Sequence, residues 1–226
     1  MTPERFNKLK GILTRRQMDL TVVMENVQTP HNLAAVARTC DAVGVFETHA
    51  ISEMQEVVLK PRAASGSRKW VGVNRHGSID EAYGALRAQG HRILCAHFDE
   101  TAVDFRTVDY TQPTAIVVGA ELDGISEEAI SKADGSIIVP MLGMVQSLNV
   151  SVATALILYE AQRQRMEKGM YASRSMDDET YETLLFEWGY PRLVPYYKRQ
   201  GLSYPPMDEE GHLILGEPRA GRLPLP

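Results

Sequence analysis

Cysteine is scarce in this sequence, and the common metal-binding and phosphate-binding signatures are missing from it. The 226 residues contain two cysteines, Cys40 and Cys95, which form no Cys-x-x-Cys pair and so cannot build a zinc knuckle or a redox dithiol. The six histidines show no metal-ligand spacing. No Gly-x-Gly-x-x-Gly, Walker A, Gly-x-Ser-x-Gly or His-Glu-x-x-His motif occurs. We therefore expect no metal site and no metal-dependent hydrolysis.

Long hydrophobic runs are also missing. The longest apolar stretch, around residues 150–159, is much shorter than the roughly 20 residues that a membrane-spanning helix needs. The first residues lack the apolar core of a signal peptide. The composition, 44% hydrophobic and 23% charged, is that of a globular protein and of neither a disordered nor a disulfide-dense chain. We expect a cytoplasmic protein without a membrane partner.

Positive charge is unevenly distributed along the chain, although the net charge is −5. Four segments, 1–20, 60–76, 161–175 and 190–201, carry formal charges of +3, +5, +3 and +3, so the remainder sums to −19. Any one of these segments could be an ordinary solvated helix face. Together they predict a surface that meets a polyanion, while the acidic remainder keeps the protein in solution.

Short apolar runs alternate with helical patterns through most of the chain. The runs contain little polar alternation, which is typical of a parallel sheet covered on both faces. The predicted strands are 20–27, 46–51, 70–74, 92–98, 115–118 and 137–139. The predicted helices are 3–16, 30–43, 78–90, a short one after Ser126, 147–168, 178–188 and 191–200. The chain is thus predicted to be an α/β protein, with a disordered or loosely docked tail from about Pro205.

Ligands of parallel α/β sheets bind beyond the carboxyl ends of the strands, so the loops there are the places to search. Three such loops carry polar side chains. Asn32 and Arg38 follow the first predicted strand, Glu121 follows the fifth, and Ser147 and Asn149 lie where the longest helix opens.

Each of these residues also has a purely structural interpretation. Asn32 can cap a helix, with Arg38 a surface cation, and Glu121 can be a solvated turn residue. Capping is the simpler explanation for Ser147. Asn149 would place a polar amide on or near a packed helix face, which favours a functional role.

Taken together, the three loops resemble the signature motifs of the SpoU (TrmH) family of SPOUT RNA methyltransferases. The matching segments are His31–Arg38, Gly119–Ser126 and Ile138–Ser151, in that order, and the core resemblance covers about residues 18–165. The basic N-terminal helix and residues 185–191 further resemble the members that methylate the 2'-oxygen of guanosine 18 in tRNA.

The resemblance implies a SPOUT fold, in which a C-terminal segment forms a deep trefoil knot that nothing in the hydrophobic pattern shows. It divides the chain into a basic helical extension (1–17), a catalytic domain (18–168) and a C-terminal helical extension with a tail (169–226). It also implies S-adenosylmethionine as cofactor, with S-adenosylhomocysteine as product. The walls of the knot would hold this cofactor through residues Ala96, Gly119, Ile138, Met141, Gly143, Ser147 and Leu148.

Family resemblance further implies a homodimer, in which Asn32 and Arg38 of one copy lie beside the cofactor of the other. The implied catalytic residues are Arg38, Asn32, Glu121, Ser147 and Asn149. Because an arginine stays protonated at neutral pH, we expect Arg38 to stabilise the developing alkoxide or to clamp a phosphate. The residues expected to bind tRNA are Arg5, Lys8, Arg15, Arg16, Arg68, Arg163, Arg165 and Arg174.

Two alternatives remain open at this point. The three motifs do not select the RNA, so a 2'-O-methyltransferase acting on ribosomal RNA fits them as well. A non-catalytic RNA-binding protein on the same fold is the other alternative, against which the intact Asn32, Arg38, Glu121 and Asn149 argue.

Overall fold

The computed structural model describes residues 1–52 and 70–214, and its chain forms two compact units. The larger unit is Arg16–Ser173, and the smaller combines Met1–Arg15 with the chain from Arg174 onward. The smaller unit thus combines the N-terminal segment with a segment from the C-terminal part of the chain. The functional division at residues 17/18 and 168/169 stays a prediction.

A parallel seven-stranded sheet forms the centre of the larger unit, with the strand order β3-β2-β1-β6-β4-β7-β5. The strands are β1 (Leu20–Glu25), β2 (Glu47–Ile51), β3 (Gly72–His76), β4 (Arg92–Ala96), β5 (Val103–Asp104), β6 (Thr114–Val118) and β7 (Gly135–Ile138). Every residue of the adjacent strands β1 and β6 is buried, as continuous apolar runs predict. The α/β parallel fold is therefore confirmed.

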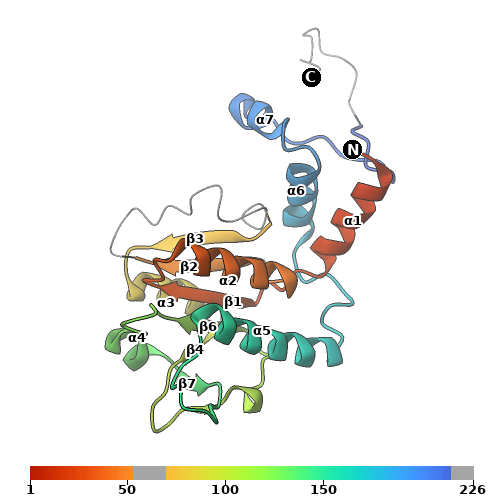
Figure 1. Ribbon diagram of the computed structural model, residues 1–226. Helices are drawn as coiled ribbons and strands as arrows, with labels where there is room; N and C mark the ends of the chain where they lie inside the picture. The colour runs from red at the N-terminus through yellow and green to blue at the C-terminus, as the bar shows by residue number, and fades with distance from the viewer. Residues whose placement is uncertain (53–69, 215–226) are drawn as a thin grey trace. The chain divides into compact units, whose positions relative to one another are not determined.

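Helices cover both faces of this sheet (Figure 1). On one face, α2 (Pro30–Ala42) and α5 (Val150–Glu167) pack side by side, and their side chains join Val22 and Ile116 in one core. On the other face, α3 (Ile79–Ala88) and α4 (Glu127–Lys132) pack against a second core that contains Val23. Successive residues of a strand point to opposite faces, so neighbouring valines of β1 serve the two cores.

Helix starts in this unit follow the expected capping chemistry in two cases. The hydroxyl of Ser78 accepts the Glu81 N–H at 3.2 Å at the start of α3, and the hydroxyl of Ser126 accepts the Ala129 N–H at 3.1 Å at the start of α4. The longest helix differs from expectation, because it begins at Val150 and Asn149 is its N-cap. The prediction that Ser147 caps this helix is therefore wrong.

The smaller unit contains α1 (Pro3–Thr14), α6 (Asp178–Gly189) and α7 (Val194–Gln200). Phe186 of α6 stacks on Tyr204 with ring centroids 4.2 Å apart. The chain after Pro205 is ordered as far as Ile214, contrary to prediction: Met207 and Leu213 form an antiparallel bridge. The hydroxyl of Tyr190 donates to the Gly211 carbonyl at 2.7 Å, which fixes this turn within the unit.

Candidate active site

Three loops converge on the carboxylate of Glu121, at the carboxyl ends of β1 and β6. Asn32, on the first turn of α2, is 2% exposed and donates its side-chain N–H to Glu121 Oε1. The Asn149 amide donates to the same oxygen at 3.2 Å and to Asn32 Oδ1 at 3.3 Å. The hydroxyl of Thr29 donates to Glu121 Oε2 at 3.4 Å. We call Thr29, Asn32, Glu121 and Asn149 the Glu121 network.

Asn32 and Asn149 have different local roles within this network. Thr29 occupies the N-cap position of α2, so the interpretation of Asn32 as a helix cap is wrong. Asn149 does cap α5, because its Oδ1 accepts the Ser151 N–H at 2.9 Å. Its amide group still reaches Glu121 and Asn32, so one side chain both caps the helix and joins the site. Asn149 is exposed, whereas the amide of Asn32 is buried and would cost about 1–3 kcal/mol without a hydrogen-bond partner.

The loop that carries Glu121 is tightly closed. Ala120 and Gly124 exchange two backbone hydrogen bonds of 3.0 Å each. A Cβ atom at Gly119 would lie 2.0 Å from the Gly124 carbonyl oxygen, so no other residue fits there without moving the loop. The carboxylate of Glu25, which is 3% exposed at the end of β1, accepts the Ser126 N–H at 3.0 Å.

Sequence reasoning missed both Thr29 and Glu25. Glu25 did leave a signal, since it is the only acidic residue in an otherwise apolar strand pattern. A buried carboxylate in that position needs a hydrogen-bond donor, and the backbone of the next loop supplies one.

Two adjoining clefts lie beside the Glu121 network, at the carboxyl ends of β4, β6 and β7. The first has a volume of about 530 Å³ and the second about 260 Å³. Ala96, Ser147, Leu148 and Ala153 line both of them, so the two form one continuous depression, which we call the main cleft.

Most of the predicted cofactor residues line the main cleft. Gly119 borders the first part, Ile138 and Met141 border the second, and Ala96, Ser147 and Leu148 border both. Gly143 is not among the lining residues, and it is exposed with no atom within 4 Å of a Cβ built on it. The walls are mainly small or apolar, with the Glu121 carboxylate at one end, and this combination fits a nucleoside that carries a positive sulfonium.

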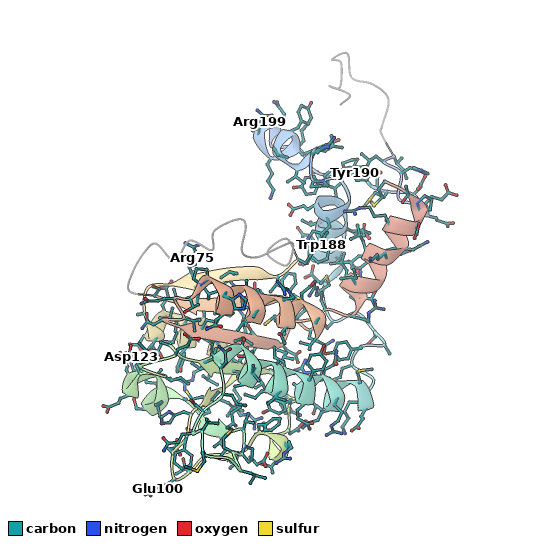
Figure 2. The ribbon with its side chains drawn as sticks, viewed as in Figure 1. Arg75, Glu100, Asp123, Trp188, Tyr190 and Arg199 are labelled. Atoms are coloured by element: carbon teal, nitrogen blue, oxygen red, sulfur yellow. The ribbon has the colours of Figure 1, made fainter. Side chains whose placement is uncertain are left out.

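Sequence reasoning also missed two side chains of the main cleft, one half-buried and one exposed. His97 and Phe98 follow β4 and line its second part, and Phe98 is 80% exposed. An apolar ring with that exposure at the mouth of a cleft is available to pack on a ligand. This loop continues to Glu100, which Figure 2 shows at the lower edge of the larger unit.

Arg38 lies six residues beyond Asn32 on α2, with an exposed side chain, and it does not line the main cleft. Within one chain, therefore, the structure brings Asn32, Glu121 and Asn149 together, places Ser147 in the adjoining wall, and leaves Arg38 two helical turns away. It also places Asn32 in contact with the Glu121 of its own chain, and the contribution of Asn32 and Arg38 to the site of a second copy stays a prediction.

Two residues predicted to bind RNA are corrected by the structure. Arg165 is fully buried and forms an ion pair with Asp19 at 2.5 Å. Arg16 is 1% exposed and pairs with Asp41 at 2.5 Å. A buried guanidinium that is already paired cannot contact a phosphate.

Other predicted RNA contacts differ in exposure. Arg5, Lys8, Arg15 and Arg163 are exposed. Arg174 is partly buried, stacked 4.3 Å from the Tyr181 ring centroid and paired with Asp178. Arg68 lies outside the described residues.

The thiols are unsuited to nucleophilic chemistry. Burial raises the pKa of Cys40 to about 12 and that of Cys95 to about 11, so both stay protonated at neutral pH. Among the described residues, no three histidine, cysteine or acidic side chains are grouped to hold a metal ion. In the same part of the chain, no helix is long and apolar enough to span a membrane.

Comparison with known proteins identifies relatives along nearly the whole chain. Residues 19–159 match the model of the SpoU rRNA Methylase family, and residues 163–215 match that of the SpoU, rRNA methylase, C-terminal family. The chain is 50% identical over 215 residues to the tRNA (guanosine(18)-2'-O)-methyltransferase of Escherichia coli K12, covering 94% of each protein.

Solved structures agree with this relationship. The TrmH/SpoU tRNA modifying enzyme of A. aeolicus superposes with a TM-score of 0.78 at 42% identity, covering 84% of this chain and 97% of that one. The SpoU methyltransferase AviRb from Streptomyces viridochromogenes, in complex with AdoMet, gives a TM-score of 0.60 at 26% identity, covering 68% of this chain and 59% of that one.

Proposed function

The chain belongs to the SpoU methylase family, and we infer that it transfers the methyl group of S-adenosylmethionine to the ribose 2'-oxygen of guanosine 18 in tRNA. The observation that carries this function is the convergence of the three motif loops on Glu121, beside a cleft of small and apolar residues. We place the enzyme in the cytoplasm, where its substrate is found. The trefoil knot of the family stays a prediction.

When bound, S-adenosylmethionine supplies an electrophilic methyl group on a sulfonium. Ala96, Leu148 and Ile138 would hold it in the main cleft, with Gly119 allowing the loop to stay closed. Methyl transfer disperses charge in its transition state, so holding the attacking oxygen in line contributes more than stabilising an anion. The Glu121 network is formed before the substrate arrives, because the buried amide of Asn32 and the exposed amide of Asn149 are already hydrogen-bonded.

The ribose hydroxyl also has to lose its proton. Arg38 carries a guanidinium that stays protonated, so we assign it the stabilisation of the developing alkoxide or the clamping of a neighbouring phosphate. Within its own chain Arg38 lies outside the main cleft, which supports the proposal that a second copy delivers it.

An exposed apolar strip on α5 supports a homodimer. Val152, Leu156 and Tyr159 are spaced as one helix face and are 46%, 42% and 52% exposed. Met144 and Val145, in the loop before α5, are 99% and 64% exposed. Large apolar side chains exposed in this number on one helix face and the loop before it favour a protein interface over a free surface. It borders the main cleft, where a second copy would contribute Arg38.

Cationic side chains of both units would bind the tRNA backbone. Exposed Arg5, Lys8 and Arg15 lie on or next to α1, and exposed Arg163 lies on α5. Each phosphate contact releases counterions, so binding should weaken as salt rises. Replacing one such residue with alanine should make the plot of log binding constant against log salt concentration less steep, by an amount that corresponds to about one phosphate contact.

The function is tested by transfer of tritiated methyl groups from S-adenosylmethionine to unmodified tRNA transcripts. We expect label in tRNA with guanosine at position 18 and none when the 2'-hydroxyl at that position is replaced by hydrogen. Label in ribosomal RNA alone would establish the first alternative. Tight tRNA binding without any transfer would establish the non-catalytic alternative.

The role of Arg38 is tested by Arg38→Ala, which should lose methyl transfer while keeping cofactor affinity. Arg106→Ala removes an exposed arginine that pairs with Asp104 outside the main cleft, and it serves as the matched control. Equal turnover in the Arg38 variant would remove it from the mechanism.

The homodimer is tested by mixing two inactive variants, Arg38→Ala and Glu121→Ala. If Arg38 acts across the interface, each mixed dimer contains one site in which both Arg38 and Glu121 are intact. Random mixing of equal amounts should then restore about one quarter of the wild-type sites. No recovery would mean that Arg38 acts within its own chain. Leu156→Glu should also give a monomeric mass in sedimentation, and a variant that stays dimeric would exclude the α5 strip as the interface.

A further inference from the structure

We propose that a third cleft, which adjoins the main cleft at the loop 120–123, binds the base of the target nucleotide and selects guanine. The inference rests on the proposed function, because it identifies the base that accompanies the methylated ribose. The cleft has a volume of about 290 Å³. Its lining residues are Asn26, Gln28, Thr29, Ala120, Glu121, Leu122 and Asp123.

The position of this cleft suits a base. It shares the loop residues 120–123 with the main cleft, so a nucleoside that spans the loop has its ribose near the Glu121 network and its base beyond. The volume of about 290 Å³ lies just below the about 300–1,000 Å³ that small-molecule sites occupy, which suits one flat heterocycle. Figure 2 shows Asp123 at the edge of the larger unit, near α4.

The side chains around the cleft match the hydrogen-bonding edge of guanine. Guanine presents two adjacent donors, N1–H and the 2-amino group, next to the O6 acceptor. The carboxylate of Asp123 can accept from both donors, and the side-chain amide of Gln28 or Asn26 can donate to O6. Adenine presents only one donor on the corresponding edge, so it would leave one carboxylate oxygen without a partner.

These three side chains are available for such contacts. Across the described parts of the chain, the side chains of Asn26, Gln28 and Asp123 make no hydrogen bond or ion pair of their own. Asn26 also has a left-handed backbone with φ of 51°, an unusual conformation outside glycine, and its N–H donates to the Ile51 carbonyl at 2.9 Å. The turn that ends β1 is thus held in a specific shape beside the cleft.

Other ligand classes fit this cleft less well. Its lining includes two carboxylates, Glu121 and Asp123, and no lysine, arginine or histidine, so it repels a phosphate. A hard cation needs several converging oxygen ligands. In the described chain no group of three acidic, histidine or cysteine side chains converges on one point.

The test compares two substrates that differ by one donor: tRNA transcripts with guanosine or with inosine at position 18, which lacks the 2-amino group. For the wild type, we expect kcat/KM to be roughly 10-fold to 100-fold higher on the guanosine transcript, the discrimination typical of a hydrogen bond to a carboxylate. In Asp123→Ala, the ratio of the two substrates should fall to about one. Glu127→Ala, which removes a nearby exposed carboxylate outside the cleft, should keep the wild-type ratio.

A second variant tests the opposite side of the base. Gln28→Ala should lower kcat/KM on the guanosine transcript but not on a transcript with 2-aminopurine, which lacks O6. If Asp123→Ala keeps the wild-type substrate ratio, the guanine pocket is refuted. If it weakens cofactor binding instead, the guanine pocket is also refuted, and Asp123 serves the main cleft, which it lines as well. If the wild-type enzyme methylates neither transcript, the proposed function itself fails, which distinguishes the two failures.

Discussion

Replacing Arg165 with methionine should destabilise the larger unit strongly, because this guanidinium is buried among fixed acceptors. It is fully buried on α5, pairs with Asp19 at 2.5 Å, and donates to the Tyr110 carbonyl at 2.8 Å and to Gln17 Oε1 at 3.0 Å. Removing one partner of a buried ion pair costs about 3–5 kcal/mol. Asp19 is 34% exposed and can be rehydrated, so we expect a loss near the lower end, about 3 kcal/mol.

Arg163→Met is the matched control, two residues earlier on the same helix. Arg163 is 54% exposed and pairs with Glu160 and Glu167, contacts that contribute about 0–1 kcal/mol because water screens them. Urea unfolding followed by circular dichroism gives the two free energies, and hydrogen exchange of α5 peptides assigns the loss to the larger unit. Equal destabilisation by the two substitutions would refute the distinction between buried and exposed arginines.

Three further predictions concern Gly119 and Glu121, in the loop after β6, and the buried His49. Gly119→Ala should lower the free energy of unfolding by roughly 1–3 kcal/mol and abolish cofactor binding in calorimetry, because its Cβ would overlap the loop. Gly143→Ala, with open space around its Cβ, should change that free energy by less than about 0.5 kcal/mol. Glu121→Ala should cost about 1–3 kcal/mol in urea unfolding by depriving a buried amide of its acceptor, and Glu121→Gln, which keeps an acceptor oxygen, should cost less. Burial and the adjacent His76 lower the pKa of His49 to about 4, below its value in the unfolded chain. As the pH falls, the unfolded chain therefore binds the proton before the folded chain does, and the free energy of unfolding should decrease between about pH 6.5 and pH 4. The decrease should be less steep in His49→Gln.

Much of the fold could be predicted from hydrophobic pattern, because the three central strands β1, β4 and β6 are mostly apolar and buried. The strand β5 could not, since its two residues pair only with β7 and leave no pattern. The sequence predicts the start of α5 too early, at Ser147 and not at Val150, because Ser147 and Asn149 are both good capping residues. Asn149 and not Ser147 becomes the N-cap because Asn149 also contacts Glu121, 28 residues away in the sequence. A contact at that separation cannot be predicted from the local sequence.

The site could be predicted in part. The motifs identified Asn32, Glu121 and Asn149, which the structure brings into contact. Charge counting treated every arginine alike and so could not separate Arg165, whose acceptors are mostly groups distant in the sequence, from exposed Arg163. Burial of a charge depends on such long-range acceptors, and a one-dimensional pattern does not reveal them.

The Glu121 network ties function to stability, and this determines which variants can be interpreted. Asn32 is buried, so its removal changes the free energy of unfolding as well as the site, and a loss of activity there has two causes. Arg38 and Asp123 are exposed, so their replacement should leave folding nearly unchanged. Loss of turnover in the Arg38 variant would therefore report on methyl transfer alone, and loss of base selection in the Asp123 variant on base recognition alone. The two variants thus separate methyl transfer from base recognition.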